Sequence, residues 1–281
     1  MGGIRVKNQA VFDPKIFMEY IARQINGGGS HIFEQTRVIE IQENTPCQLI
    51  TDSGAVVFAR DVVVATDAVS ANRFFLQTKV AAYRTYAVAA QIKTSRLGTA
   101  LFWDGENPYH YIRPAGNRWI IGGADHKTGM ESDTESCFGK IEQFVSEQFK
   151  VESFDYSWSE QILESVDGLP FIGLNPTSRH IYVSLGYSGN GITFGTLGGN
   201  IIADLAAGKE NQWSDLYEPK RIKLLAAAKD FLAENKDFAR CLISDRFSKS
   251  EVKNIDEVPL GQGKRIAIEG KAAAVYKDPH G

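Results

Sequence analysis

Three glycines in the stretch "GYSGNGITFGTLGG" have the spacing of a loop that holds an anion; they are Gly189, Gly191 and Gly195. They follow a predicted strand, "HIYVSLG", and open a predicted helix, "ITFGTLGGNIIADLAAG", which is the setting of a dinucleotide-binding loop. A helix N-terminus preceded by glycines presents free N–H groups and a partial positive charge. The stretch therefore predicts a site for an anion, or for a group that becomes anionic during reaction. The alternative is that the glycines only allow the strand and the helix to pack closely.

A complete dinucleotide-binding unit would continue differently after this helix. It needs a second parallel strand that ends, roughly 20 residues on, in an acidic residue for the ribose. Here the helix leads into more helix, and Asp204 lies within the helix itself. The sequence thus disfavours a phosphate-binding Rossmann unit, and a nicotinamide-dependent dehydrogenase stays only as a weaker alternative.

The stretch "YHYIRP" carries a second group of residues that suit chemistry. Because side chains alternate along a strand, Tyr109, Tyr111 and Arg113 share one face, and His110 and Ile112 share the other. Two phenols and a guanidinium on one face suit a substrate pocket, in which Arg113 would pair with a carboxylate as a bidentate fork. A solvated strand edge with stacked tyrosines is the alternative interpretation.

The elements that must position these residues follow two patterns. From about residue 81 to 129, strands separated by short glycine, proline and asparagine turns predict an antiparallel sheet, and a helix is predicted over 133–149. Residues 62–65 form a continuous apolar run, as a strand buried on both faces requires. The stretch 219–247 has a helical pattern rich in alanine and lysine, and short strands are predicted after it.

Composition excludes several classes of protein. With 281 residues and a net charge of −3, the chain can form one large or two ordinary domains and has no basic excess for nucleic acid or anionic membranes. No apolar run is long enough to span a bilayer, and the N-terminus lacks a signal peptide, so a cytoplasmic location is expected. Cys47, Cys137 and Cys241 are scattered, so neither a disulfide framework nor a metal site is expected.

Together the motifs resemble a known family. "ESVDGLPFIG", the glycine stretch with its strand, and "NPYHYIRPAGNRWIIGGADHKTG" are similar to the C-terminal half of FAD-dependent oxidoreductases of the D-amino-acid oxidase and glycine oxidase superfamily. "FDPKIFMEYIARQINGGGSHIFEQTRVIEI" and "VVVATDA" resemble the middle portion of the same proteins, and the order of motifs is specific over residues 10–208. The fold class implied is α/β with α+β: a partial FAD/NAD(P)-binding domain of the GR2 type, interleaved with an antiparallel-sheet substrate domain.

The resemblance implies five regions. Residues 1–75 would form a partial FAD-binding domain, 76–160 the antiparallel substrate-binding domain, 161–210 a return to the FAD-binding domain, and 211–255 a helical linker. Residues 256–281 are similar to the opening strands of the Rieske iron–sulfur domain that some members carry. The CxH and CxxH ligand pairs of a Rieske cluster are absent from the sequence, so no iron–sulfur cluster is expected in this chain, although the parent family carries [2Fe-2S].

Two departures from the family bear on function. The family's N-terminal unit with GxGxxG has no counterpart before Asp13, so the chain is expected to be a fragment, or to work with a separate FAD-binding segment or as a homo-oligomer. In glycine and D-amino-acid oxidases an arginine shortly before the "DGLPFIG" segment clamps the substrate carboxylate, whereas this chain has "WSEQILESV" there. The expected substrate is therefore a small amine, or an amino acid anchored differently.

The resemblance also implies FAD as cofactor. The loop from Gly186 to Thr193 would run along the pyrimidine edge of the flavin ring, where N–H groups stabilise the charge of reduced flavin. Asp167 and Gly168 match a turn beside the ribityl chain, and Val38 matches a backbone contact to adenine. The full set of expected cofactor-binding residues is Val38, Ala65, Thr66, Asp167, Gly168, Gly186, Gly189, Asn190, Gly191, Ile192 and Thr193. For Val38, Ala65 and Thr66, plain core packing is the alternative.

The expected activity is oxidation of a C–N bond by hydride transfer to flavin N5, which is an oxidative deamination, with electrons passing to a Rieske centre in the full-length parent. No general base is expected. The alternative is a non-catalytic fragment, or a subunit that needs a separate FAD-binding chain.

Overall fold

A computed structural model describes residues 4–67, 76, 79–93, 98, 100–221, 251–268 and 271–278. Its contacts divide the chain into two compact units, residues 1–223 and 224–281, which are described separately. Most of the predicted helical stretch 219–247, and Cys241 with it, lies outside the described residues.

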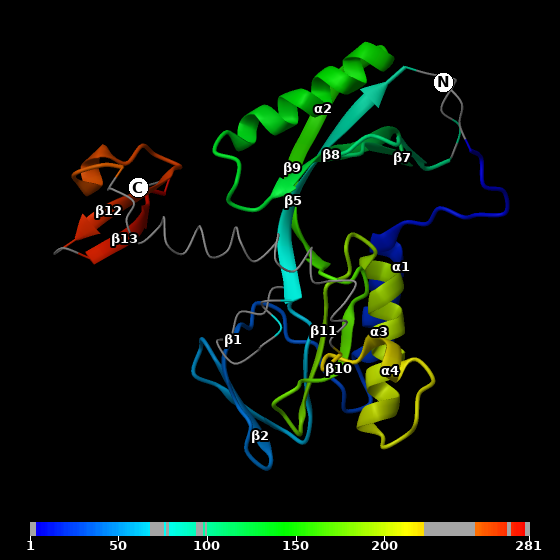
Figure 1. Cartoon of the computed structure of the whole chain (residues 1–281), viewed down its shortest axis with the longest axis vertical. Helices are drawn as coiled ribbons and strands as arrows, with labels where there is room; N and C mark the ends of the chain where they lie inside the picture. Colours follow the sequence, from blue (N-terminus) through cyan, green and yellow to red (C-terminus); the bar gives the residue numbers. More distant parts are fainter. Residues whose placement is uncertain are drawn as a thin grey trace. The chain divides into compact units, whose positions relative to one another are not determined.

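A five-stranded antiparallel sheet forms one part of the larger unit (Figure 1). Its strands stand in the order β6-β7-β8-β5-β9, and all described pairings are antiparallel, as the sequence predicts. Their bounds are β5 (Val80–Ile92), β6 (Phe102–Trp103), β7 (Tyr111–Ala115), β8 (Arg118–Lys127) and β9 (Val151–Ser165). Strand β9 continues past residue 160, so the sheet extends beyond the predicted boundary at that position.

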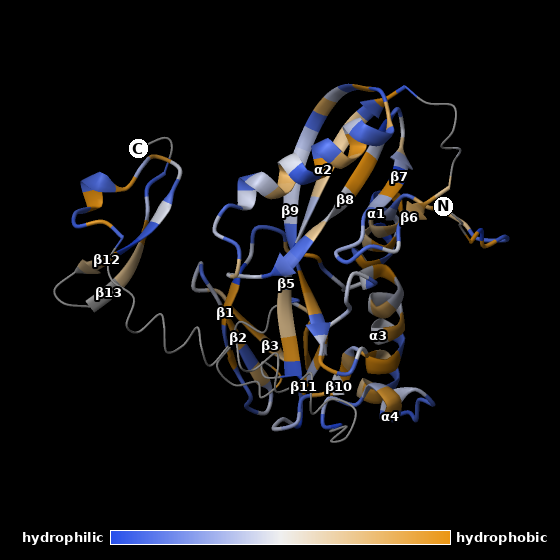
Figure 2. Cartoon of the chain, turned by 45° about the horizontal axis from the view of Figure 1, so that its top comes forward, coloured by the Kyte–Doolittle hydropathy of each residue, from blue (hydrophilic) through white to orange (hydrophobic). Residues whose placement is uncertain are grey.

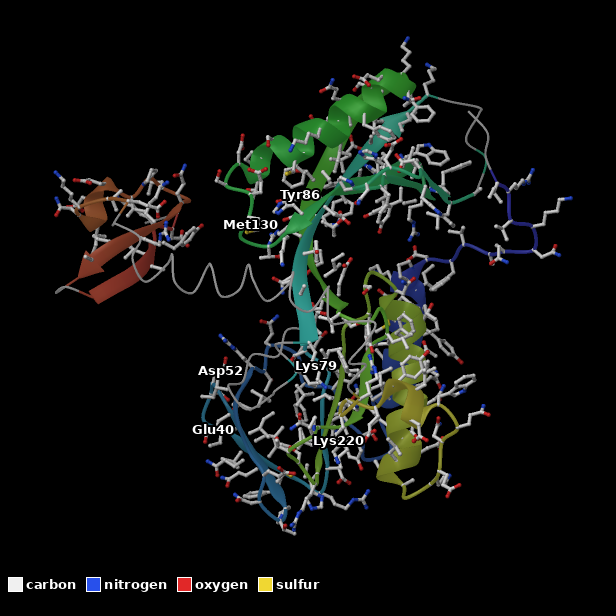
Figure 3. The ribbon with its side chains drawn as sticks, in the orientation of Figure 1. Glu40, Asp52, Lys79, Tyr86, Met130 and Lys220 are labelled. Atoms are coloured by element: carbon white, nitrogen blue, oxygen red, sulfur yellow. The ribbon has the colours of Figure 1, made fainter. Side chains whose placement is uncertain are left out.

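Helix α2 (Thr134–Gln148) covers one face of this sheet (Figure 1). Asp133 is the N-cap residue of this helix, and its carboxylate accepts a hydrogen bond from the Ser136 N–H at 3.2 Å. The helix buries Cys137 and Ile141 against the sheet, where Tyr86 is fully covered (Figure 3). The burial of this apolar face confirms the predicted helix at 133–149.

A second sheet has the order β10-β11-β4 and contains β10 (Phe171–Leu174), β11 (Ile181–Leu185) and β4 (Val62–Val64). Strands β11 and β4 are parallel, and helix α3 (Gly191–Ala206) follows β11 and packs on this sheet. Figure 2 shows α3 as strongly apolar. Helix α3 is followed by the short helix α4 (Ser214–Tyr217).

The prediction that 62–65 is buried on both faces is wrong at Val63, a residue that is 50% exposed. Val62 and Val64 are buried on one face of β4, whereas Val63 points to the other face, where it lines an open cavity. The apolar run of residues 62–65 therefore contains one residue, Val63, that the described residues leave half exposed.

Further elements lie outside these two sheets. Strands β1 (Val38–Gln42), β2 (Cys47–Thr51) and β3 (Val56–Ala59) form a third, antiparallel sheet. Helix α1 (Pro14–Ile25) has Asp13 as its N-cap residue, whose carboxylate accepts a hydrogen bond from the Lys15 N–H at 2.8 Å, and the helix buries no residue.

In the smaller unit, the 3-10 turn η2 (Ile255–Glu257) precedes an antiparallel hairpin of β12 (Gly263–Ile268) and β13 (Lys271–Tyr276).

Candidate active site

The glycine stretch forms a tight connection between β11 and α3. Gly186 and Gly189 have φ values of 80° and 77°, where a glycine is favoured, and Ser188 adopts 47° without being glycine. Asn190 stands at the N-cap position of α3 but makes no side-chain cap hydrogen bond. The amides of the first turn, from Gly191 to Thr193, are therefore not satisfied by a cap and form an anion-compatible helix N-terminus.

The carboxyl ends of β4 and β11 meet at one edge because the two strands are parallel. Ala65 and Thr66 follow β4 directly, and the next residue, Asp67, has a φ of 56°. Left-handed backbone at non-glycine residues is sparse and gathers at ligand sites. In open parallel sheets, ligands bind at this edge. Asp67 and Ser188 are two such residues, and they follow the neighbouring strands β4 and β11.

A cavity of about 540 Å³ lies beside the same strands. Ala65, Asp67 and Tyr187 line it together with the small-residue side of α3, which includes Gly195 and Gly198. The Tyr187 hydroxyl and the Ser184 hydroxyl are 2.5 Å apart. Of the expected cofactor-binding residues, only Ala65 lines this cavity.

The tyrosine face is arranged as the alternation predicts. Ile112 is buried beneath α2, and the His110 ring stacks on Phe144 of α2 with centroids 4.0 Å apart. Tyr109 and Tyr111 lie together, with ring centroids 6.4 Å apart, although Tyr109 precedes the strand itself. Burial is the main cause that raises the pKa of Tyr111 to about 12, so this phenol is neutral and is a hydrogen-bond donor at ordinary pH.

Arg113 lies on β7 two residues beyond Tyr111, and its positive charge partly offsets the rise in the pKa of that phenol that burial causes. One Nη donates to the Phe12 carbonyl at 3.4 Å, which is a long contact, and its Nε is buried without a hydrogen-bond partner. A guanidinium with a spare buried N–H has capacity for an oxygen ligand.

Sequence reasoning missed Asp125, which joins this face. Its charge acts on both Tyr109 and Tyr111, and its own pKa is raised, mainly by burial. The signal in the sequence is the pair Gly122–Gly123, because glycines inside a strand mark a bulge or a close approach.

Strand β9 brings the glycine loop and the tyrosine face together. The Ser188 N–H donates to the Leu163 carbonyl of β9 at 3.1 Å. The next residue, Glu164, acts electrostatically on Tyr109. Earlier on β9, the negative charge of Glu160 adds to burial in raising the pKa of Asp67. The ends of β4 and β11 are thus within electrostatic reach of the substrate face expected from the sequence.

The other predicted contacts are less closely grouped. The Asp167 carboxylate is engaged by Arg221, whose Nε and Nη2 each donate at 2.8 Å, and Gly168 turns with a φ of 75°. Both side chains of this ion pair are less than a tenth exposed. Val38 lies at the start of β1, in the third sheet, and is 42% exposed. The contacts of the described residues do not bring Val38 to the glycine loop.

Comparison with known proteins decides the family. The model of the FAD dependent oxidoreductase family, DAO, matches residues 1–205. The chain belongs to this FAD-dependent oxidoreductase family. A curated relative, "Putative Rieske 2Fe-2S iron-sulfur protein YhfW" of Bacillus subtilis, is 25% identical over 282 residues, covering 98% of this chain and 55% of the relative. The glycine oxidase of Geobacillus kaustophilus is 27% identical over 190 residues, covering 65% of this chain and 50% of the enzyme.

The fold agrees with this assignment. The crystal structure of glycine oxidase from Geobacillus kaustophilus superimposes with a TM-score of 0.58 and 25% identity, covering 69% of this chain and 54% of the enzyme. L-proline dehydrogenase from P. horikoshii gives a TM-score of 0.53 at 21% identity, with 69% and 55% coverage, and shares the fold. The chain spans about half the length of the curated relatives that it matches.

The residues at the parallel-strand edge fit the family's cofactor. An uncapped helix N-terminus suits the electron-rich edge of a flavin, and the left-handed loop lets the backbone approach closely. No group of three or more His, Cys, Asp and Glu that could hold a metal ion occurs in the described ranges, where Cys47 and Cys137 are buried free thiols. Nor is any described helix long and apolar enough to cross a membrane.

Proposed function

We propose that this chain supplies the substrate face and the flavin-side loop of an FAD-dependent oxidoreductase that oxidises the C–N bond of an amine or amino acid. Bound FAD would accept a hydride from the carbon beside the nitrogen. The described residues would bind the flavin edge, orient the substrate and keep water from the reacting carbon. Oxidative deamination is the resulting reaction class, and transfer of electrons to a Rieske centre is the proposal for a longer parent protein.

Each group of residues has a part in this proposal. The amides of Gly191, Ile192 and Thr193 would stabilise negative charge on the reduced flavin, as a preorganised set of donors does. Tyr109 and Tyr111 would form the apolar walls of the substrate pocket and donate hydrogen bonds from neutral phenols. Arg113 would hold a substrate carboxylate. Ala65, Thr66, Asp167 and Gly168 stay proposed backbone contacts to FAD, and Val38 a proposed adenine contact.

One observation carries this proposal: β9 links the glycine loop to the tyrosine face. The hydrogen bond from the Ser188 N–H to the Leu163 carbonyl, and the effect of the adjacent Glu164 on Tyr109, support a single site that contains both groups. Relatives similar in sequence include proteins named glycine oxidase and gamma-glutamylputrescine oxidoreductase, which are named for an amino acid and an amine.

A second candidate role follows from strand β4. Val63 is half exposed, β4 ends its sheet among the described residues, and the cavity of about 540 Å³ lies beside it. An unpaired parallel edge next to a small-residue groove favours pairing with another strand and helix. In this role the chain is a subunit or piece that completes its FAD site with a separately supplied segment.

Titration of FAD with the purified chain separates the two roles. We expect quenching of flavin fluorescence in both, but tight binding by the chain alone would contradict the second role. Gly189→Ala should weaken FAD binding, because its φ of 77° admits a side chain only with strain and the loop would shift. Gly54→Ala is the matched control, since Gly54 has a φ of 82° in the β2–β3 turn and a Cβ there meets nothing within 4 Å. Equal FAD affinities of the two variants would contradict the proposed loop contact.

A further inference from the structure

Strand β8 contains a bulge that changes where one carboxylate points. Arg84 pairs with His126, but Tyr86 pairs with Gly123, so Ala124 and Asp125 together stand opposite the single residue Thr85. Ala124 has a φ of 55°, which is a strained value for alanine. Bulges of this kind re-aim a side chain, and they are frequent next to active sites.

The Asp125 carboxylate is left incompletely satisfied by the bulge. Thr85 donates a hydrogen bond to it, whereas Oδ1 is buried and has no hydrogen-bond partner. A buried oxygen without a hydrogen-bond partner is unfavourable, and more so when it is charged. The fold therefore maintains two unfavourable features at one position, a strained Ala124 and an unpaired oxygen, which calls for a ligand that satisfies the oxygen.

The surroundings of Asp125 define that ligand. After burial, the negative charge of Asp125 further raises the pKa of both Tyr109 and Tyr111. The positive charge of Arg113 lowers the pKa of Tyr111. The Arg113 Nε is likewise buried without a partner. Around Tyr111, the face therefore offers one unsatisfied acceptor with negative charge and one unsatisfied donor with positive charge. Such a pair is complementary to a molecule that carries an ammonium group, with or without a carboxylate.

We propose that Asp125 binds the amino group of the substrate as an ammonium ion, and that it is the residue that selects amines over uncharged or purely anionic molecules. The inference rests on the proposed function and deepens it. Asp125 accepts hydrogen bonds from the ammonium through Oδ1, Thr85 holds the carboxylate in place, and Arg113 receives the carboxylate of an amino acid. Before the hydride leaves, the ammonium releases one proton to water, so that the neutral amine is the species that is oxidised, to an iminium ion. A simple amine then binds through Asp125 alone.

Calorimetric titration of the FAD-loaded protein with three probes tests this role. Glycine carries both charges, n-butylamine only the ammonium, and glycolate only the carboxylate. Asp125→Asn should weaken binding of glycine and n-butylamine about tenfold or more, and that of glycolate less than about twofold. Arg113→Met should weaken glycine and glycolate and spare n-butylamine. Glu152→Gln is the control for net charge, because Glu152 is exposed and pairs with Lys93 at the far end of β9.

A fold-wide effect of the substitution is checked by a second variant. Thr85→Val removes the hydroxyl that holds the carboxylate, and it should weaken the same two probes by a smaller factor. Thermal unfolding of each variant shows whether the fold is kept. Equal n-butylamine affinities of wild type and Asp125→Asn overturn the inference, as does an equal loss for all three probes, which a merely structural role would give. Wild-type protein that binds neither amine also overturns it, and reduction of the flavin by a wider panel of amines then decides the proposed function separately.

Discussion

Gly122 lies directly opposite Tyr111 across the β7–β8 ladder, and a Cβ at this glycine would be 2.1 Å from Cζ of the phenol. The Tyr111 ring thus occupies the space that a side chain at position 122 would fill. Gly122→Ala should push the ring aside, because the obstructing atoms belong to the end of a side chain that can rotate. We expect catalytic efficiency to fall up to about 100-fold, since small misplacements in a site have such effects, and steady-state kinetics measures this.

Two further glycines serve as references for that variant. Gly139 lies within α2 with nothing within 4 Å of a Cβ, so Gly139→Ala should raise the free energy of unfolding by about 0.5–1 kcal/mol and leave activity unchanged. Gly123→Ala would meet the Tyr109 carbonyl oxygen at 2.6 Å, and backbone cannot rotate away. It should lower stability more than Gly122→Ala does. Unchanged kinetics in Gly122→Ala would count against Tyr111 as a substrate contact.

Gly198 and Gly199 make a matched pair for the packing of α3. A Cβ at Gly198 would be 2.6 Å from Oγ of Ser184, whereas one at Gly199 meets nothing within 4 Å. Gly198→Ala should therefore cost about 1–3 kcal/mol through overpacking, and Gly199→Ala should be neutral or stabilising. Urea unfolding of both variants decides the matter; equal midpoints would show that α3 does not pack against β11 as closely as described.

The buried pair of Asp167 and Arg221 should contribute strongly to stability in single-variant tests. Arg221→Met removes the guanidinium from a buried carboxylate, and breaking a buried ion pair in this way costs about 3–5 kcal/mol. The double variant with Asp167→Leu should lose less than the sum of the two single losses. Lys15→Met removes one partner of the exposed Lys15–Glu19 pair and should change the stability far less, because solvent screens the pair. Additive losses at Asp167 and Arg221 would argue against a direct pair.

Alkaline pH should destabilise the protein through Tyr111. Burial raises the pKa of this phenol to about 12, whereas an unfolded chain ionises it near about 10. The contribution of the neutral phenol to folding is thus complete below pH 10 and is lost as the pH rises from about 10 to about 12. Between about pH 9 and about pH 11, wild type should lose about 1 kcal/mol more unfolding free energy than Tyr111→Phe. Parallel losses in the two proteins would show that Tyr111 is solvated.

Local patterns predicted the parts of this fold that depend on neighbours in sequence. The helix expected at 133–149 is found at Thr134–Gln148. It could be predicted because its N-cap residue and its apolar face lie within one short stretch of sequence. The period of two in "YHYIRP" predicted that Ile112 and Tyr111 point to opposite faces, and in the structure Ile112 is buried beneath α2 while Tyr111 lies beside Tyr109. Family resemblance added the order of the elements, which periodicity alone does not give.

Features that depend on distant residues were not predictable from the sequence. The partner of Asp167 is Arg221, which is 54 positions away in a stretch that reads as the start of a helix. The bulge at Ala124 arises from the register between β8 and β5, so the sequence of β8 alone hints at it only through its two glycines. Val63 is half exposed because it lines a cavity beside α3, and no local pattern encodes where that helix leaves the sheet uncovered.

Anaerobic mixing of the FAD-loaded protein with amines and amino acids tests the central claim most directly. If the chain supplies the substrate face of an amine or amino-acid oxidoreductase, at least one such compound should bleach the absorbance of the oxidised flavin, and Asp125→Asn should require a higher concentration of it. A flavin that is bound but stays oxidised with every amine and amino acid tested would contradict the account.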